Sequence, residues 1–403
     1  MNIVVAGGGI GGLATAVGLQ RRGFEVQVYE QAAEIRPVGA GVVLAPNSYR
    51  LLGEFGIDRG VDGQVPPGAI HLRRWRDGVT ISRQVLGQAC IERFGASYVA
   101  LHRADLLDAL VSHVRPGSLH LGRRIVAVVQ DNDGVDVQFA DGDAVRADLV
   151  VAADGIHSRV ADAVGIATRP RASGYAAYRG MVPFAQVSDI GTDHAVWLGP
   201  DRHFVHYPVS DGKVLNFVAI VPSPRAEAES WSQPGELTDA RRHFAGWDGR
   251  VRCILDAADA VSLWGLYDRP TRDTYHVGRV VVIGDAAHPV LPFFAQGASL
   301  ALEDAAVLCA VLADLGESDI TRRLAAFSAA RVERVRRVQD VSHRNATMFH
   351  LPDGAQQQAR DARLADASGG DPFRDNAWLF AHDVRADIRS DGRTVAQSAG
   401  DVR

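Results

Sequence analysis

The feature of this sequence that most constrains its fold is a glycine-rich turn near the N-terminus. Gly7, Gly9 and Gly12 have the G-x-G-x-x-G spacing, directly after an apolar run at 3–6 that predicts a buried strand. An apolar helical stretch follows the turn, and a second apolar run at 26–29 predicts another strand. Strand, helix and strand within about thirty residues form a βαβ unit, whose parallel strands require the helical crossover.

Each glycine of the turn has a predicted task in binding a dinucleotide. Gly7 makes the sharp turn out of the strand, Gly9 lets the backbone approach a pyrophosphate, and Gly12 lets the helix pack closely on the sheet. The helix N-terminus offers free N–H groups and a partial positive charge to the diphosphate. Glu30 ends the second strand, where a carboxylate accepts hydrogen bonds from ribose hydroxyls and repels a 2′-phosphate. The turn therefore predicts FAD or NAD, the alternative being a simple glycine-rich turn.

The rest of the chain predicts a mixed α/β fold. Two further apolar runs, at 149–153 and 280–283, predict buried parallel strands. Polar and apolar residues alternate at about 70–100 and 172–270, which is typical of antiparallel sheet. We therefore predict a Rossmann-like domain with a β-rich insertion. The predicted later helices lie at about 103–110, 298–315 and 319–349.

Composition and charge exclude several classes of function. The formal net charge of -5 leaves no basic surface for nucleic acid. Arginines are frequent at 321–344, but acidic residues are interleaved at helical spacing, which predicts a solvated helix face. The 3 cysteines are isolated, which fits neither a disulfide framework nor a zinc site. No uncharged stretch is long enough to cross a bilayer, so we expect a cytoplasmic protein with no metal and no membrane partner.

Several segments resemble those of one protein family. The N-terminal turn together with 148–158, 284–289 and 292–298 is similar to the three signatures of the class A flavoprotein aromatic hydroxylases. The branch that this chain resembles most contains salicylate hydroxylase and 6-hydroxynicotinate 3-monooxygenase. The resemblance covers nearly the whole chain in collinear order. Further matching stretches lie at 39–42, 46–47, 102–106, 178–180, 206–209 and 378–380.

The resemblance implies a p-hydroxybenzoate hydroxylase-like fold. A Rossmann-like FAD-binding domain would carry an inserted antiparallel β-sheet domain for the substrate, followed by C-terminal helices. No second G-x-G-x-x-G is present, as expected in a family that lacks a separate nicotinamide domain. The implied division is a discontinuous FAD-binding domain at 1–71, 101–170 and 271–345, a substrate domain at 72–100 and 171–270, and a helical segment and tail at 346–403.

The resemblance also implies which residues contact FAD. Asp285 matches an acceptor for the ribitol chain, although a helix N-cap would explain the same residue. Gly297 and Ala298 begin a helix whose N–H groups would face the flavin pyrimidine, which is anionic when reduced. Arg103 matches a position near the ribose and diphosphate, and a surface arginine is the alternative. Asp154 matches the second signature, where a sharp turn after a strand is the alternative. Two more residues expected at FAD are Val43 and Pro292.

On the substrate side, His203 and Tyr207 are the candidate catalytic residues. They share one face of a predicted strand by period two, and their ends lie about 13 Å apart, enough to flank an aromatic ring. In the nearest relatives, an H-x-x-x-Y pair on this strand faces the substrate. Ordinary strand packing is the alternative for both residues. His206 points to the other face and is expected to be structural.

Three more residues are candidates for substrate binding. Arg179 would orient a carboxylate or the flavin, and a salt-bridged structural arginine is equally compatible with the sequence. Phe293 and Phe294 are expected to form walls of the pocket. Some relatives carry a polar residue at or beside these two positions, which predicts a less polar substrate here.

The implied function is that of an FAD-dependent monooxygenase. NADH or NADPH would reduce FAD, O₂ would add to give a flavin C4a-hydroperoxide, and oxygen would pass to a small phenolic or N-heteroaromatic acid. His203 is the expected base that ionises the ring hydroxyl.

The alternatives are an FAD-dependent epoxidase or hydroxylase of a larger natural product, a flavin-binding accessory protein without turnover, and an NAD-dependent dehydrogenase. The sequence leaves open the substrate and its regiospecificity, decarboxylation, the nicotinamide preference, and whether the protein is a monomer or a homodimer.

Overall fold

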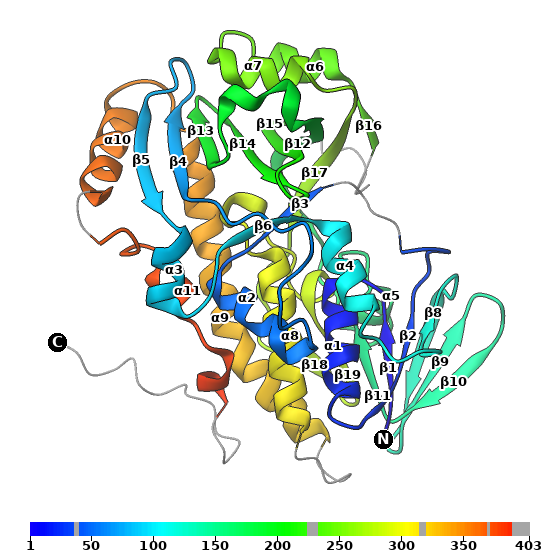
Figure 1. Ribbon diagram of the computed structural model, residues 1–403. Helices are drawn as coiled ribbons and strands as arrows, with labels where there is room; N and C mark the ends of the chain where they lie inside the picture. Colours follow the sequence, from blue (N-terminus) through cyan, green and yellow to red (C-terminus); the bar gives the residue numbers. More distant parts are fainter. Residues whose placement is uncertain (36–39, 224–232, 314–319, 369–370, 389–403) are drawn as a thin grey trace.

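Two large sheets, joined by long helices, organise the chain (Figure 1). The computed structural model describes all residues except 36–39, 224–232, 314–319, 369–370 and 389–403. The first sheet has 6 strands in the order β18-β19-β11-β1-β2-β7, and every pair is parallel except β18 with β19. These strands are β1 (Asn2–Ala6), β2 (Glu25–Tyr29), β7 (Leu119–His120), β11 (Leu149–Ala152), β18 (His276–Val277) and β19 (Val280–Val282).

The predicted βαβ unit at the start of the chain is confirmed. Helix α1 (Ile10–Gln20) connects β1 to β2 and packs against α8 (Gly297–Leu312). All residues of β11 and β19 are buried, which is the pattern expected of parallel strands covered on both faces. Apolar runs therefore identified four strands of this sheet, β1, β2, β11 and β19, whereas the short strands β7 and β18 were not predicted.

The second sheet has 8 strands in the order β16-β17-β12-β15-β14-β13-β4-β5. Its pairs are antiparallel except β13 with β4. One face packs against α6 (Leu237–His243) and α7 (Gly249–Asp256), with Phe204 and Phe244 in the shared core. The strands are β4 (Ala69–Arg74), β5 (Thr80–Val85), β12 (Arg171–Pro183), β13 (His194–Gly199), β14 (Arg202–Val209), β15 (Val214–Pro222), β16 (Gln233–Gly235) and β17 (Val261–Asp268).

Two small sheets and several short helices complete the body of the protein. The pair β3–β6 is antiparallel, and β8, β9 and β10 form a three-stranded sheet at the side of the molecule (Figure 1). These strands are β3 (Gly41–Leu44), β6 (Val99–His102), β8 (Ile125–Gln130), β9 (Val135–Phe139) and β10 (Ala144–Ala147). The helices are α2 (Pro46–Tyr49), α3 (Gly87–Phe94), α4 (Arg103–Val111) and α5 (Arg159–Ala163), with 3₁₀ turns η1 (Arg50–Phe55), η2 (Phe184–Gln186), η3 (Ser188–Ile190), η4 (Gly284–Ala286) and η5 (Pro292–Phe294).

A single long helix, α9 (Ile320–Phe349), links the two large sheets (Figure 1). It packs against α8 and β18 near its start, and its last residue contacts His203 of β14. The chain then forms α10 (Ala355–Ser368), α11 (Ala377–Phe380) and η7 (Val384–Asp387). Among the helices that the structure describes, none has the length and apolar character needed to cross a membrane.

Candidate active site

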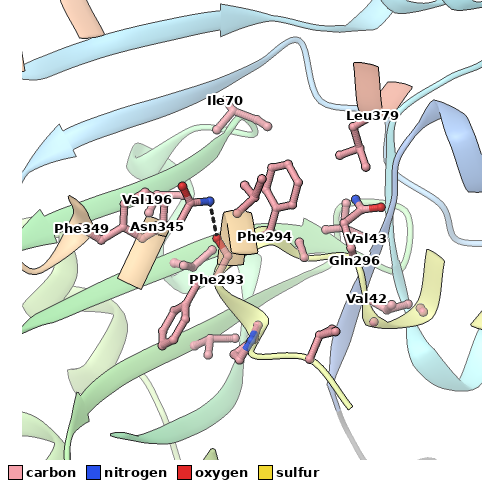
Figure 2. Close-up of a pocket in the computed structure, with 18 of the residues that line it drawn as sticks. Val42, Val43, Ile70, Val196, Phe293, Phe294, Gln296, Asn345, Phe349 and Leu379 are labelled. Carbon is pink, nitrogen blue, oxygen red and sulfur yellow. Dashed lines mark hydrogen bonds between the residues drawn. The ribbon is translucent and has the colours of Figure 1, made fainter. Parts of the chain in front are cut away.

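A continuous cavity of about 1520 Å³ lies between the two large sheets. Sites for one small ligand usually enclose about 300–1,000 Å³, so this cavity has room for a dinucleotide and a second molecule. Its lining comes from the start of α1, from β3, β12 and β14, from η4 and η5, and from α8, α9 and α11. Figure 2 shows the part around η5, where the rings of Phe293 and Phe294 point in opposite directions.

The glycine turn has the geometry that its sequence predicts. Gly7 has a φ of +107°, and a Cβ there would collide with the carbonyl oxygen of Ala153. A Cβ at Gly12 would collide with the carbonyl oxygen of Gly7. Gly9 differs, because a Cβ there would meet no atom within 4 Å, and Gly9 lines the cavity. The open space above Gly9 fits a diphosphate at the N-terminus of α1.

The carboxylate of Glu30 holds the backbone of the glycine turn by hydrogen bonds. One carboxylate oxygen accepts a hydrogen bond from Gly8 N at 2.7 Å, and the other accepts one from Ala32 N at 2.8 Å. The side chain does not line the cavity. Each oxygen keeps a second lone pair, so Glu30 could still accept a hydrogen bond from a ribose hydroxyl. That contact stays a prediction.

Arg103 and Asp285 bring opposite charges to the cavity. Both line it, and neither side chain has a hydrogen-bond partner among the described residues. Burial lowers the pKa of Arg103 and raises that of Asp285, and each charge favours the ionised form of the other. Asp285 caps no helix, since η4 begins at Gly284 without a side-chain cap. A cation and a carboxylate without partners fit the diphosphate and hydroxyl groups of FAD.

Asp154 uses its carboxylate within its own turn. It accepts hydrogen bonds from Ser158 Oγ at 2.5 Å and from Val160 N at 3.2 Å. Gly155 lines the cavity, but Asp154 does not. The structure thus places this aspartate behind the cavity wall, and direct contact with a ligand stays a prediction.

A buried ion-pair network supports the turn at Asp285. Asp304 of α8 accepts hydrogen bonds from Gly284 N at 2.8 Å and from His288 at 2.7 Å. Arg331 of α9 binds the other oxygen of Asp304 at 2.7 Å, and both side chains have an exposed fraction of 0%. Although burial by itself raises the pKa of Asp304, His288 and Arg331 bring it below its usual value. Asp304 therefore stays ionised and holds the backbone beside Asp285.

The same network supports the start of α8. Glu303 binds Arg334 through 2 hydrogen bonds of 3.1 and 2.7 Å, and it accepts another from Asn47 at 2.8 Å. The Asn47 amide also donates to Gln296, which precedes the helix. We expected the arginines of 321–344 to form a solvated face, and for Arg331 and Arg334 this was wrong. Interleaved charge at helical spacing does not reveal whether acidic partners lie on a neighbouring helix.

The N-terminus of α8 opens into the cavity as expected. Gly297 and Ala298 line it, and no side chain caps the helix. The first N–H groups and the positive end of the helix dipole are therefore available to a ligand. Val43 and Gln296 also line the cavity, and in Figure 2 both are drawn to the right of Phe294.

Three polar side chains of α9 hold the loop that leads to Phe294. Gln339 donates to the carbonyl of Pro289 at 3.4 Å, and Ser342 to that of Leu291 at 2.6 Å. Asn345 donates to the carbonyl of Phe293 at 3.0 Å, a bond that Figure 2 marks with a dashed line. Their spacing of three residues puts them on one helix face. They fix the loop in which Pro292, Phe293 and Phe294 line the cavity.

The substrate end of the cavity is formed by β14. His203 and Tyr207 both line it, while His206 is buried without a hydrogen-bond partner on the other face of the strand. The period-two expectation for these side chains is therefore confirmed. His203 Nδ1 lies 2.7 Å from His350 Nε2, and burial lowers the pKa of His203 well below 6.5. His350 was missing from the sequence analysis, since it lies 147 residues away along the chain.

Tyr207 belongs to a second group of rings. The ring centres of Tyr207 and His194 lie 4.8 Å apart, and those of His194 and Tyr98 lie 5.6 Å apart. All three residues line the cavity, and burial raises the pKa of Tyr207 to about 12. Tyr207 is thus a neutral phenol at physiological pH, able to donate a hydrogen bond to a ligand. Neither His194 nor Tyr98 was predicted from the sequence.

Arg179 brings a buried cation to this end. Its guanidinium lies 4.5 Å from the centre of the Trp264 ring, and Nε has no hydrogen-bond partner. Arg179 makes no salt bridge with any residue that the structure describes, which leaves its positive charge uncompensated. A buried cation without a counterion fits an anionic ligand.

The chain after α10 closes the cavity. Trp378 of α11 lines it and stacks on Phe294, with ring centres 6.1 Å apart and an interplanar angle of 25°. The guanidinium of Arg337 lies over the Trp378 ring, 3.8 Å from the ring centre. Arg50 donates to the carbonyl of Phe380 at 2.6 Å and anchors α11. The resemblance to the family included residues 378–380, but it did not predict that Trp378 stacks on Phe294.

Comparisons with known proteins agree with this geometry. The family described as "FAD binding domain" matches residues 1–342. The chain is 39% identical to 3-amino-4-hydroxybenzoate 2-monooxygenase PtmB3 of Streptomyces platensis, over 95% of this chain and 96% of that protein. It is 33% identical to 6-hydroxynicotinate 3-monooxygenase of Bordetella bronchiseptica, over 98% of both.

Similarity extends to the three-dimensional structure. A salicylate hydroxylase substrate complex superposes with a TM-score of 0.81 at 27% identity, covering 96% of each chain. The similarity in sequence and in fold to these proteins extends over nearly the whole length of the chain. The chain therefore belongs to the FAD-binding-domain family and, within it, to the class A flavoprotein aromatic hydroxylases, which are FAD-dependent monooxygenases.

Proposed function

We propose that this protein hydroxylates a small hydroxylated aromatic acid, either a phenol or an N-heteroaromatic ring. The observation that carries the proposal is the substrate end of the cavity. There His203 and Tyr207 face the same space as Arg179, and Phe293 and Phe294 form apolar walls. A ring bearing a hydroxyl group and a carboxylate matches these three kinds of surface.

The charge of the site favours a carboxylate on the substrate. Arg179 has no counterion among the described residues, and a carboxylate would neutralise it by charge-assisted hydrogen bonds. The relatives named above act on 3-amino-4-hydroxybenzoate and 6-hydroxynicotinate, both of which carry a carboxylate and a ring hydroxyl. We propose 3-amino-4-hydroxybenzoate as the first compound to test.

We propose that FAD occupies the cavity between α1 and α8. The diphosphate would lie at Gly9, with Gly7 and Gly12 shaping the turn and Glu30 near the ribose. Bound FAD would accept hydride from NADH or NADPH and activate O₂ for transfer to the ring. The remaining FAD contacts that we propose are Val43, Arg103, Asp154, Asp285, Pro292, Gly297 and Ala298.

The residues of the chain itself prepare the ring for reaction. We propose that His203 Nε2 accepts the proton of the ring hydroxyl, because Nδ1 is already bound to His350 and the residue lines the cavity. Tyr207, as a neutral phenol, would donate a hydrogen bond to the ring substituent. Phe293, Phe294 and Trp378 would exclude water from the reacting atoms.

The proposal extends to the domains of the protein, its compartment and its oligomeric state. The six-stranded sheet and its helices would form the FAD-binding part, and the eight-stranded sheet the substrate part, with the boundaries given above. Cys90, Cys253 and Cys309 are free thiols, which supports a reducing cytoplasm. Either a monomer or a homodimer is compatible with a cavity lined by a single chain.

A turnover experiment tests the proposal. Purified protein should be yellow, oxidise NADH or NADPH faster when 3-amino-4-hydroxybenzoate is added, and release a product heavier by one oxygen atom in mass spectrometry. The matched control is 3-aminobenzoate, which lacks the hydroxyl and should give no oxygenated product. Colourless protein that does not bind added FAD would contradict the cofactor assignment. Flavin-loaded protein that oxygenates no member of a panel of hydroxylated aromatic acids would contradict the substrate class.

A further inference from the structure

The pair His203–His350 is a buried hydrogen bond between two imidazoles. The nitrogen–nitrogen distance is 2.7 Å, and the exposed fractions of the two residues are 2% and 7%. A bond of this length requires one proton between the rings, so one imidazole donates and the other accepts. The direction of this bond determines the tautomer of His203, and hence what Nε2 offers to the cavity.

Only one direction makes His203 a base. If His203 donates from Nδ1, its Nε2 carries a lone pair and accepts a proton from a ring hydroxyl. If His350 donates instead, the His203 proton lies on Nε2, and the residue is a hydrogen-bond donor to the substrate. The proposed function requires the first arrangement.

The surroundings of His203 disfavour a lasting positive charge there. Phe293 and Phe349 lie 5.4 and 5.3 Å from its ring centre, and no carboxylate contacts it among the described residues. A proton accepted at Nε2 must therefore leave through Nδ1, and among the residues that the structure describes the only group bound to Nδ1 is His350.

His350 is better placed to carry the charge. Its backbone carbonyl accepts a hydrogen bond from Asp201 N at 3.0 Å, and the Asp201 charge favours the protonated form of the ring. The ring centre of Tyr175 lies 4.6 Å from that of His350, with an interplanar angle of 45°, which is within the distance at which an aromatic ring attracts a cation. Burial lowers the pKa of His350 to about 4, so the proton would be held only transiently.

We propose that His350 is a positioning residue that takes the proton from His203 while the substrate is ionised. The proposal rests on the proposed function. The O–H bond of the ring hydroxyl breaks and its electron pair stays on oxygen, while a new N–H bond forms at His203 Nε2. In the same step, the His203 Nδ1–H bond breaks and an N–H bond forms at His350 Nε2. The charges are a phenolate and an imidazolium on His350, with neutral His203 between them, and the proton returns when the product hydroxyl is restored.

The variant His350→Gln tests the relay. Glutamine can accept the Nδ1–H bond of His203 but cannot take its proton. At neutral pH, we expect product formation from 3-amino-4-hydroxybenzoate to fall about 10²-fold, with FAD content and hydride transfer from NADH retained. Product formation should recover as the pH approaches about 10, because a phenol then ionises without a base. A packing defect would not be repaired by pH.

The matched control is His343→Gln, on the same helix. His343 is exposed, binds Asp268 at 2.7 Å and does not line the cavity, so turnover should match that of the wild type. Wild-type turnover in His350→Gln at neutral pH, or a loss that does not respond to pH, would overturn the relay. Failure of the wild type itself to hydroxylate would instead contradict the proposed function.

A second measurement requires neither turnover nor a variant. Nitrogen-15 NMR of histidine-labelled holoenzyme distinguishes the two tautomers of a neutral imidazole. We expect the His203 proton on Nδ1. A proton on Nε2 of His203 would overturn the proposal even if His350→Gln failed to fold.

Discussion

The two ends of the cavity are constructed in different ways. At the FAD end, backbone atoms of the glycine turn and of the uncapped start of α8 form much of the surface, beside the side chains of Arg103 and Asp285, and buried ion pairs hold that backbone in place. At the substrate end, side chains from β12, β14, η5, α9 and α11 form the surface. A backbone surface tolerates little change, whereas a side-chain surface can be altered one residue at a time. The FAD end should therefore respond to substitution in an all-or-none manner, and the substrate end by degrees.

The largest effect should come from Gly9→Val. Because a Cβ at Gly9 meets no atom within 4 Å, the folded protein can accommodate the side chain, but the diphosphate cannot lie where the side chain projects. We expect FAD retention to be abolished, as measured by the ratio of flavin to protein absorbance. Gly9→Ala, which adds one methyl group, should weaken retention less. Folded Gly9→Val protein with full flavin content would show that the diphosphate lies elsewhere.

Arg331→Met tests the ion pairs behind the FAD end. Removing one partner of a fully buried network leaves Asp304 and Glu303 short of positive charge, which typically costs about 3–5 kcal/mol of unfolding free energy. Urea unfolding followed by circular dichroism measures the loss. The control is Arg336→Met on the same helix, where an exposed pair with Glu333 contributes about 0–1 kcal/mol. Equal losses in the two variants would refute the supporting role of the network.

His203→Ala tests whether the substrate end can fail while the FAD end works. We expect retained FAD and continued NADH oxidation, with hydroxylated product falling about 10²–10⁴-fold because the base is lost. Oxygen would then be reduced to hydrogen peroxide, so product formed per NADH oxidised is the quantity to measure. Unchanged coupling would assign the base elsewhere, with Tyr207, which shares the cavity face of β14, considered first.

The smallest effect should come from Asn345→Ala. The variant loses one hydrogen bond to the carbonyl of Phe293, which typically contributes about 1 kcal/mol. We expect a modest loss of stability in urea and a higher KM for the aromatic substrate, with FAD content unchanged. A loss of FAD as complete as in Gly9→Val would contradict the separation of the two ends.

Sequence alone predicted the glycine turn and the buried strands beside it because their signals are local. The glycine spacing and the buried strands lie within short windows, and the period-two rule placed His203 and Tyr207 on one face. The substrate end depends on contacts between distant segments. His350, which directly follows α9, and Trp378 of α11 reach it only because the fold brings the end of α9 and α11 to the cavity.

One missed feature did leave a signal in the sequence. Helix α8 is apolar apart from Ser299 and the adjacent acids Glu303 and Asp304, and a buried acid pair requires cations nearby. Matching those acids with Arg331 and Arg334 would have corrected the expectation of a solvated face. The polar residues Gln339, Ser342 and Asn345 likewise recur every three residues on a helix with an apolar stripe. Neither signal identifies its partner without the fold.

The packing of α1 against α8 has a consequence for how the protein is made. The first helix leaves the ribosome early, yet the helix that covers it follows only after most of the chain has been synthesised. Almost every residue of α1 is buried in the finished protein, so the nascent chain must keep an apolar helix uncovered throughout that interval. Cofactor capture therefore comes late in biosynthesis, and protection of the waiting helix by chaperones should set the yield of flavin-loaded protein.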